Sequence, residues 1–238
     1  MIARFIANPC EDSLTASVFG HLLHLPIEQC WEILQAACPS SQFPKFPGEP
    51  RAIHAWPSWN AVGTRNTHRV IPDLFIEFAD FDLIVEAKRW DVPMQDKEQW
   101  KAELRGYINE YGVNKRAVKM LAVGGVHTHQ DDELSDVWNP DGSDAYRFNC
   151  PVFMCPWSRV LLACQRLKHC LLQGPRASLS RTLADVRILD NLTSLFVRHG
   201  FAPLRWFKDF SFSTNLLSAS ADTERSQFSA ISNRLRQV

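Results

Sequence analysis

The sequence lacks the features that mark several large classes of protein. None of its apolar runs reaches the roughly 18 residues that a membrane-spanning helix needs. The first residues, MIARFIANPCED, turn acidic too soon for a signal peptide, so we expect a cytoplasmic location and no membrane partner. Hydrophobic residues make up 45% and charged residues 22% of the chain, and these ordinary globular values exclude disorder, collagen and coiled coil.

The cysteines also lack a recognisable pattern. There are seven, an odd number, and no two of them form a CxxC pair. We interpret them as reduced thiols with a structural role, as expected in a reducing compartment. A zinc site built from Cys150, Cys155 and either His127 or His129 is the alternative, although this spacing matches no zinc finger or ribbon.

Net charge is absent too, but the two signs are unevenly distributed. Residues 1–165 carry 15 Lys and Arg against 21 Asp and Glu, whereas residues 166–238 carry 11 against 5, a balance of +6. An enzyme that cleaves phosphodiesters would show this asymmetry, because it needs carboxylates to bind metal and arginines to bind phosphate. We therefore predict that Arg176, Arg181 and Arg187 bind nucleic acid.

Length and periodicity predict an α/β fold with one mixed central sheet. A chain of 238 residues can bury about 70–75% of its unfolded surface in one large domain. We divide it into a core, residues 1–157, and a helical, basic C-terminal extension, residues 158–238, within the same domain or appended to it. Helical spacing predicts helices over residues 9–25, 26–37, 96–111, 160–172 and 183–199, and apolar, β-branched runs predict strands over residues 52–56, 70–78, 82–90, 117–123 and 152–154. Most of residues 39–60, with five prolines, and the polar, acidic residues 127–149 are predicted to be loops.

One group of charged residues falls inside the predicted hairpin. Asp73 opens its first strand, and Glu86 and Lys88, two residues apart, share one face of the second. Hairpin pairing brings the three charges together among apolar neighbours, where charges are costly unless they are paired or bind metal. Two carboxylates and a lysine suit a Mg²⁺-dependent phosphodiesterase, and because converging carboxylates disfavour each other's ionisation, we expect a raised pKa for at least one.

The segments Pro72-Asp73 and Glu86-Ala87-Lys88 resemble the signature of the PD-(D/E)xK nuclease superfamily. The predicted order of helix, three strands, helix and strand is similar to the αβββαβ core of that restriction-endonuclease-like fold, over about residues 8–125. The resemblance implies that Asp73, Glu86 and the Ala87 carbonyl bind Mg²⁺, which Mn²⁺ can replace. It implies that Lys88 orients the attacking water and stabilises the developing charge.

The same resemblance suggests further catalytic residues. Many members add a glutamate from the first helix, for which Glu11 is the candidate, and some add a glutamine or tyrosine from the helix after the lysine, for which Gln99 and Tyr107 are candidates. The spacing of Gln99 and Tyr107 departs from the QxxxY pattern of the exonuclease branch, so we do not assign the chain to that branch.

Each of these residues has a structural alternative. Asp73, Glu86 and Lys88 could form a cross-strand salt bridge, and Glu11 could be the third residue of a capping box whose N-cap is Asn8. Gln99 could be a solvated helix position. Glu77, Asp80 and Asp82 read as surface charges of the hairpin, and they are the rival ligands if the register is shifted by one residue.

Two other motifs have an open interpretation. His127, His129, Asp131 and Asp132 contain possible metal ligands, but they follow Gly124-Gly125 in a predicted loop. Trp56 and Trp59 could stack on bases or form a small core under the proline-rich segment.

The sequence therefore predicts a Mg²⁺-dependent nuclease that cuts DNA, in restriction, repair or defence against phage. The alternatives are a ribonuclease of the same fold and a catalytically inert module that binds nucleic acid or takes part in an assembly. A homo-oligomer or a partner subunit is compatible with either.

Overall fold

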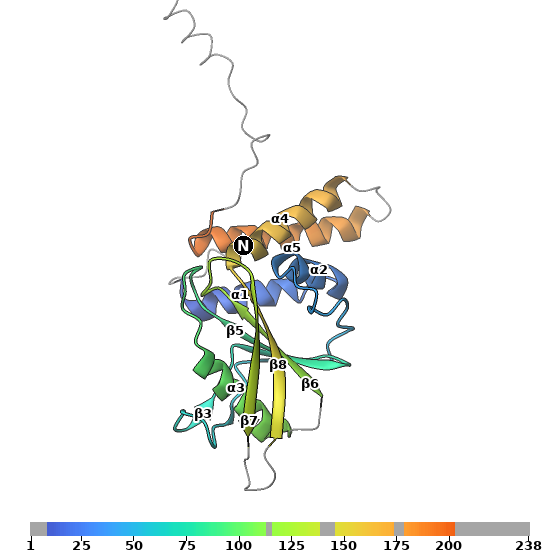
Figure 1. The fold of residues 1–238 in the computed structure, drawn as a ribbon. Helices are drawn as coiled ribbons and strands as arrows, with labels where there is room; N and C mark the ends of the chain where they lie inside the picture. Colours follow the sequence, from blue (N-terminus) through green and yellow to red (C-terminus); the bar gives the residue numbers. More distant parts are fainter. Residues whose placement is uncertain (1–8, 113–115, 139–145, 174–178, 203–238) are drawn as a thin grey trace, which may run out of the picture. The chain divides into compact units, whose positions relative to one another are not determined.

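The computed structural model describes residues 9–112, 116–138, 146–173 and 179–202 (Figure 1). They form an α/β protein with a six-stranded mixed sheet and two C-terminal helices. The helices are α1 (Glu11–Leu22), α2 (Ile27–Ala37), α3 (Lys97–Tyr111), α4 (Trp157–Gln173) and α5 (Leu179–Arg198). The strands are β1 (Ala52–Ala55), β2 (Trp59–Asn60), β3 (Arg69–Val70), β4 (Leu74–Glu77), β5 (Phe81–Ala87), β6 (Ala117–Val123), β7 (Gln130–Trp138) and β8 (Tyr146–Cys155).

The strand order in the large sheet is β1-β4-β5-β6-β8-β7. β1, β4 and β5 are antiparallel neighbours, and the chain then crosses through α3 to place β6 parallel to β5. β8 is parallel to β6, and β7 pairs with β8 as an antiparallel edge strand. Because β5, β6 and β8 run in one direction, their carboxyl ends meet at a single edge of the sheet, where the candidate site lies.

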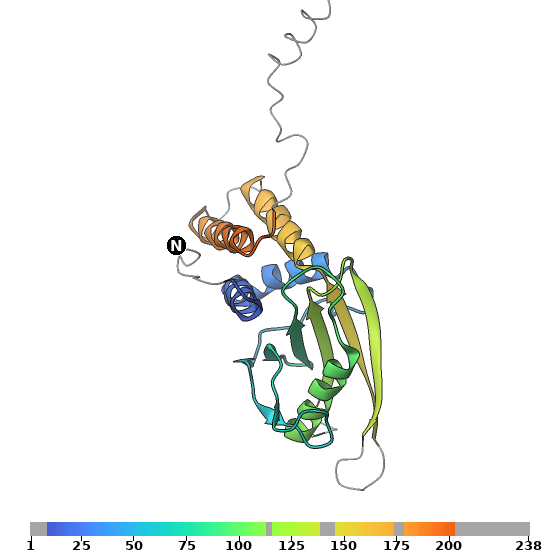
Figure 2. The ribbon, with the colours of Figure 1, turned by 90° about the vertical axis from the view of Figure 1, so that its left-hand side faces the viewer.

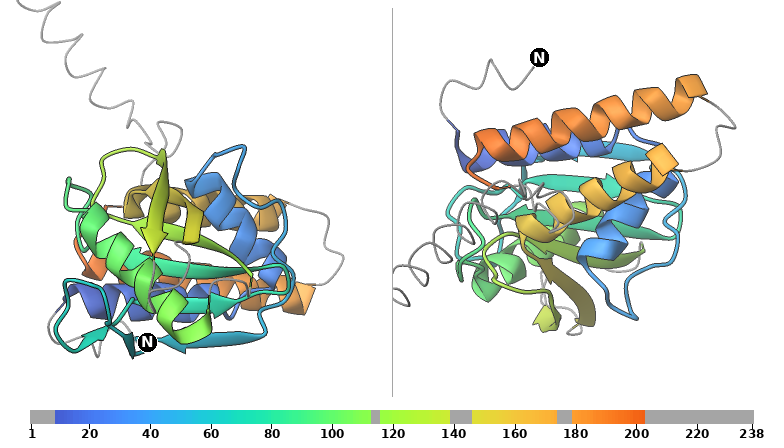
Figure 3. Two further views of the ribbon diagram at one scale, coloured as in Figure 1. Left: turned by 60° about the horizontal axis from the view of Figure 1, so that its bottom comes forward. Right: turned by 90° about the horizontal axis from the view of Figure 1, so that it is seen from above.

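Alternation along the strands divides the interior into two cores. Leu83, Val85 and Ala87 of β5 face a core shared with α1, α2, α4 and α5, whereas Ile84 faces a core shared with α3 and the β2–β3 ribbon. Figure 2 shows α3 on one side of the sheet and the other helices on the opposite side. Figure 3 shows α5 beside α1 and α4 beside α2, as their contacts require.

The hairpin, α3 and β6 lie close to their predicted positions. The first hairpin strand starts later than predicted, at Leu74, because Pro72 has no N–H to donate to a ladder. Val70 pairs instead with Trp59 in the β2–β3 ribbon. In α3, Asp96 is the N-cap and accepts a hydrogen bond from the Glu98 N–H (2.9 Å). The helix ends at Tyr111, as predicted, and Gly112, with φ of 82°, is its C-cap.

Two predictions of local structure were wrong. Residues 127–149 are not a loop insertion, because β7 and the first part of β8 form a long hairpin there and β8 extends well beyond residues 152–154. Strands at a sheet edge can have strongly polar sequences, because one of their faces is solvated. For this reason β7 was not recognised as a strand from apolar runs. Helix α1 begins at Glu11 with Cys10 as N-cap, so Glu11 is not the third residue of a capping box begun by Asn8.

The C-terminal helices are slightly longer than predicted. They pack on α1 and α2 and complete the core on that face of the sheet with Trp157, Leu192 and Phe196. None of the helices in the described part of the chain is long and apolar enough to cross a membrane.

Candidate active site

The predicted charged residues meet at the carboxyl end of β5, between the first turns of α1 and α3. Glu86 is almost fully buried, with 3% of its side chain exposed, and its Oε1 accepts hydrogen bonds from Lys88 Nζ (2.5 Å) and Gln99 Nε2 (2.6 Å). Gln99 Oε1 in turn accepts from Lys88 Nζ (3.2 Å). Glu86 and Lys88 share the face of the sheet that α3 covers, as their spacing predicts, and Gln99 is not a solvated helix position.

Asp73 joins this group from the residue just before β4. Its Oδ2 accepts a hydrogen bond from the Ala87 N–H (2.7 Å). Burial and then the charge of Glu86 raise the pKa of Asp73 to about 7, against the opposing effect of that hydrogen bond and of Lys88. The expected raised pKa of one carboxylate is therefore confirmed. Asp73 is placed to exchange a proton near neutral pH.

The Lys88 ammonium lies among carboxylates. Burial alone lowers its pKa, but Glu86, Glu11 and Asp73 together raise it by more, so the net pKa is raised. Lys88 Nζ lies 3.9 Å from Glu11 Oε1 as well as 2.5 Å from Glu86 Oε1. The ammonium is therefore held as a cation in this site.

The backbone of Lys88 is fixed from three sides. Its N–H donates to Val123 O (2.8 Å) on β6, and its carbonyl accepts from Trp157 Nε1 (2.8 Å) at the start of α4. Gly124, which follows Val123, has a φ of 70° and lies so close to Lys88 that a Cβ on it would be 2.0 Å from the Lys88 carbonyl oxygen. A side chain at residue 124 would thus displace the lysine, which gives the Gly-Gly pair a structural reason.

Glu11 faces the site although it begins α1 and does not cap it. Its Oε2 accepts a hydrogen bond from the Arg89 N–H (2.8 Å), 78 residues along the chain. The segment after β5 is held further by Asp91, whose carboxylate accepts from the N–H groups of Trp157 (2.6 Å) and Ser158 (2.9 Å) and so caps α4.

Sequence reasoning missed Glu103, which is 1% exposed under the same sheet. Burial and then the charge of Glu86 raise the pKa of Glu103 well above its ordinary value. Neither of its side-chain oxygens has a hydrogen bond of ordinary geometry among the described residues. The signal was available, because Gln99, Glu103 and Tyr107 follow one another at intervals of four on the buried side of α3.

Acidic groups exceed basic ones here. Asp73, Glu86 and Glu11 surround the ammonium of Lys88, and Glu103 lies beside Glu86. Carboxylate and carbonyl oxygens are the donors that Mg²⁺ prefers, so the donor set fits such an ion in its chemistry. In the described part of the chain, however, no three His, Cys, Asp or Glu side chains are already arranged as ligands of one metal ion. Ala87, whose carbonyl was predicted to be a ligand, is fully buried between Glu86 and Lys88.

No protein-family model, curated protein or solved structure matches this chain. The geometry of its own residues therefore carries the functional argument.

The other predicted site residues are dispersed. Arg187 is exposed on α5, eleven positions before Arg198, which corresponds to about 16 Å along a helix. Arg181 lies in the first turns of the same helix, and Arg176 lies outside the described residues. The end of α5, and not its middle, approaches the site, since Phe201 just beyond it stacks on Trp90.

The two tryptophans of the proline-rich segment have different positions. Trp59 is 1% exposed and packs against Phe75 and Tyr107, so it belongs to the core and is not available for stacking on bases. Trp56 is 40% exposed, has a φ of 48° that is rare outside glycine, and donates its N–H to Asp73 O (3.1 Å). Trp56 therefore stands at the edge of the site.

The alternative ligands do not converge. Cys150 and Cys155 belong to different cores on opposite faces of β8, so the zinc alternative built on both is wrong. His129 pairs with Asp131 (3.7 Å) and Asp132 with Lys97 (2.5 Å). Cys10 is exposed at the N-cap of α1, so it is not one of the buried structural thiols.

Asp82 was also misjudged as a surface charge. It is fully buried, accepts a hydrogen bond from the Tyr107 hydroxyl (2.7 Å) and pairs with Arg116 (3.1 Å). Glu77 pairs with the same guanidinium (2.9 Å). Tyr107 thus belongs to this second cluster, at the far end of the hairpin, and not to the candidate site.

Proposed function

We propose that the chain is a Mg²⁺-dependent nuclease of the PD-(D/E)xK type that hydrolyses DNA. The observation that carries the proposal is the meeting of Asp73, Glu86 and Lys88 at one end of the β4–β5 hairpin, with Gln99 and Glu11 beside them. The order α2, β1, β4, β5, α3, β6 supports it, because it is the helix, three strands, helix and strand that the resemblance implies.

The proposed roles follow from the chemistry of each group. Asp73, Glu86 and the Ala87 carbonyl would hold the Mg²⁺, which when bound would polarise the phosphate and lower the pKa of a water molecule. Lys88 would stabilise the negative charge that develops on the phosphate, which a buried cation does more strongly than a solvated one. Gln99 bridges Glu86 and Lys88 and so would keep both in place. Glu11 restrains the chain just after Lys88 through the Arg89 N–H.

Side chains around the site are suited to contact a nucleic acid strand. Trp56 is exposed beside Asp73, and Trp90 is 41% exposed with the Arg89 guanidinium 4.5 Å from its ring centroid. Aromatic rings can stack on bases of any sequence, and a guanidinium adds attraction for phosphate. These residues offer nucleic-acid contacts nearer to the site than the arginines of α5.

Digestion of nucleic acids by the purified chain tests the proposal. Supercoiled plasmid, linear duplex, single-stranded DNA and RNA are incubated with Mg²⁺, Mn²⁺ or EDTA. We expect metal-dependent cleavage of DNA that Glu86→Gln loses. Asp80→Asn is the matched control, since Asp80 is an exposed acid in the turn of the same hairpin. Equal cleavage by wild type and Glu86→Gln would refute the assignment, and cleavage of RNA alone would identify a ribonuclease.

An inert module that binds nucleic acid is the second candidate. The direct contact of Lys88 Nζ with Glu86 Oε1 favours it, because an ion pair that compensates both charges requires no metal. The same digestions decide between the two, together with binding measured on the same nucleic acids. Wild-type protein that binds DNA but cuts neither DNA nor RNA with either metal would identify the inert module.

A further inference from the structure

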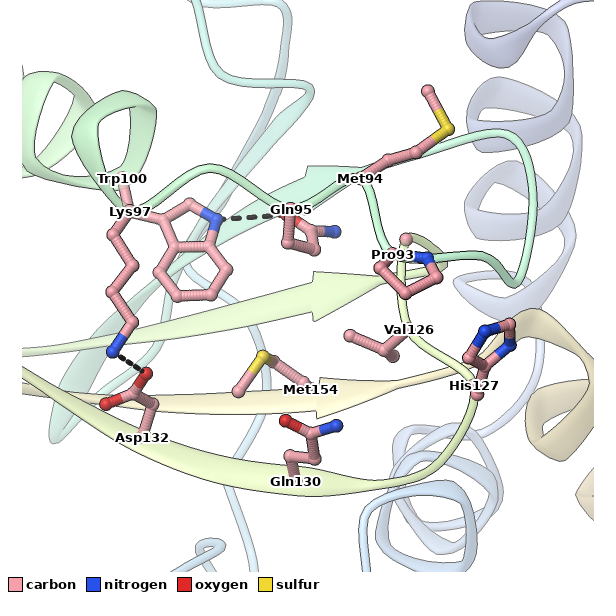
Figure 4. Close-up of a pocket in the computed structure, with 11 residues that line it drawn as sticks. Pro93, Met94, Gln95, Lys97, Trp100, Val126, His127, Gln130, Asp132 and Met154 are labelled. Carbon is pink, nitrogen blue, oxygen red and sulfur yellow. Dashed lines mark hydrogen bonds and ion pairs between the residues drawn. The ribbon is translucent and has the colours of Figure 1, made fainter.

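A cavity lies directly beside the candidate site. Its volume is about 250 Å³, and it lies between the segment that leads into α3, the turn after β6 and the paired strands β7 and β8 (Figure 4). Figure 4 shows the Lys97–Asp132 ion pair at one end of the cavity and His127 at the other. Sequence patterns did not indicate this cavity, because three of its lining residues, His127, Gln130 and Asp132, lie in the segment that was predicted to be a loop.

Gly125 connects the cavity to the site. It lines the cavity, and a Cβ at this position would lie 2.8 Å from Gln95 Cγ and 3.0 Å from Lys88 Cγ. Gln95 is itself fixed, because its Oε1 accepts from Trp100 Nε1 (3.0 Å) and its Nε2 donates to Gly124 O (3.0 Å). The cavity therefore borders the aliphatic part of the Lys88 side chain through Gly125.

The lining suits a flat ring with a polar edge. Trp100, Val126 and Met154 are buried apolar side chains in the wall, and a methionine thioether packs well against an aromatic ring. Gln130 and Met154 are direct cross-strand partners, so their side chains share the face that points toward Trp100 (Figure 4). The exposed amide of Gln130 can donate and accept at the mouth of the cavity.

Size and charge exclude larger or more highly charged groups. A volume of 250 Å³ is below the roughly 300–1,000 Å³ of pockets that take drug-sized ligands, so one ring system fits but not a nucleotide with its phosphates. The ammonium of Lys97, which is the cation among the lining residues, is already paired with Asp132 at 2.5 Å. A phosphate would meet no unpaired lysine or arginine there.

We propose that this cavity holds a single base of the nucleic acid strand whose phosphate lies at Lys88. The inference rests on the proposed function and narrows its substrate. A base can enter the cavity only when it leaves its stack, so the preferred substrate is single-stranded or locally unpaired next to the cleaved phosphate.

Filling the cavity from a solvated position tests this proposal. Gln130→Trp places a ring at the mouth of the cavity on an edge strand that tolerates aromatic residues. Glu133→Trp is the matched control, because Glu133 is exposed on the same strand but three positions along, on the other face. Gln130→Ala, which only removes the amide, is the second variant should the tryptophan variant fail to fold, and thermal unfolding checks all three.

The probe is a set of single-stranded oligonucleotides, DNA and RNA, with one 2-aminopurine at successive positions. To prevent cleavage, the protein is titrated into the oligonucleotides either in EDTA, with each variant made in the wild-type protein, or in Mg²⁺, with each variant combined with Glu86→Gln. We expect a fluorescence change at one position near the cut and affinity about 10-fold or more weaker for Gln130→Trp, with Glu133→Trp unchanged. Gln130→Ala should weaken binding several-fold.

The outcomes separate this proposal from the nuclease assignment. Cleavage by wild type combined with equal affinities for the Gln130 variants and Glu133→Trp would overturn the base pocket and leave the nuclease intact. Absence of cleavage combined with a Gln130-dependent fluorescence change would support the base pocket and count against the nuclease assignment. Nucleoside monophosphates that bind the cavity while oligonucleotides do not would also overturn it, since the occupant would then be a free nucleotide.

Discussion

The two ends of the β4–β5 hairpin both bury charge beneath α3, but they balance it differently. At the turn end, Asp82 and Glu77 share the guanidinium of Arg116, and the Tyr107 hydroxyl donates to Asp82. His54 Nε2 lies 3.2 Å from Glu77 Oε1 and adds a further partner. At the open end, Asp73, Glu86 and Glu11 surround the ammonium of Lys88. Glu103 lies beside Glu86 and has no hydrogen bond of ordinary geometry among the described residues.

This difference separates a structural cluster from the cluster to which we assign the proposed function. A compensated cluster stabilises the hairpin once it is formed and has no remaining capacity for a ligand. At the open end, burial and then the neighbouring carboxylates raise the pKa of Asp73 and Glu103, which costs stability in the isolated chain and favours a cation that would relieve it. Variants at the two ends should therefore affect different measurements.

The largest effect is expected from Lys88→Met. Loss of the buried cation should reduce cleavage by at least about 10²–10³-fold, because Lys88 is the side chain proposed to stabilise the developing charge. Affinity for Mn²⁺ should be retained or increase, since the ammonium no longer competes for Glu86 Oε1. Plasmid digestion and calorimetric Mn²⁺ titration measure the two effects. Loss of Mn²⁺ binding together with cleavage would mean that Lys88 holds the carboxylates in place and takes no part in the chemistry.

At the turn end, Arg116→Met should destabilise the fold by about 3–5 kcal/mol, because it leaves Asp82 buried without its cation. Denaturant unfolding measures this loss. Below the unfolding transition, cleavage per folded molecule should match the wild type, since Arg116 belongs to the other cluster. A cleavage defect in fully folded Arg116→Met would show that the two ends are coupled.

Asp73→Asn should stabilise the protein at alkaline pH. A carboxyl group that titrates near 3.8 when unfolded and at about 7 when folded makes stability fall as pH rises between these values. Asparagine keeps an acceptor for the Ala87 N–H and removes the charge, so we expect a gain on the order of 2–4 kcal/mol above pH 7 and none below pH 4. Unfolding in EDTA at pH 4, 6 and 8 measures it. A gain that is equal at all three pH values would contradict the raised pKa.

The smallest effect is expected from Gln99→Ala, which removes the bridge between Glu86 and Lys88. Second-layer partners of this kind contribute about 10–100-fold to activity or metal affinity. The neighbouring variant Glu98→Ala is the control, because Glu98 is exposed and pairs only with Lys101 on the surface (2.6 Å). Similar cleavage rates for the two variants would make Gln99 a packing residue.

Sequence patterns predicted this site because its main residues lie on two adjacent strands with strong apolar runs. The two-residue spacing of Glu86 and Lys88 determined their shared face, and hairpin pairing brought Asp73 to them. Glu103 was missed because a single charged residue on the buried side of a helix only interrupts the apolar pattern in the sequence. Its role becomes visible once the structure shows that α3 covers Glu86. The edge hairpin was missed because β7 has no apolar alternation strong enough to distinguish it from a loop.

The long reach of the contacts that hold Lys88 has a consequence for how the protein is made. Glu11 is joined to Arg89 across 78 residues, and Trp157 is joined to Lys88 across 69. A chain emerging from the ribosome carries Asp73, Glu86 and Lys88 long before it carries the indole that fixes the Lys88 carbonyl. Contacts of such high sequence separation form slowly, after local helices and hairpins. The charged residues are therefore synthesised early, but the geometry that organises them is complete only after α4 has begun to dock.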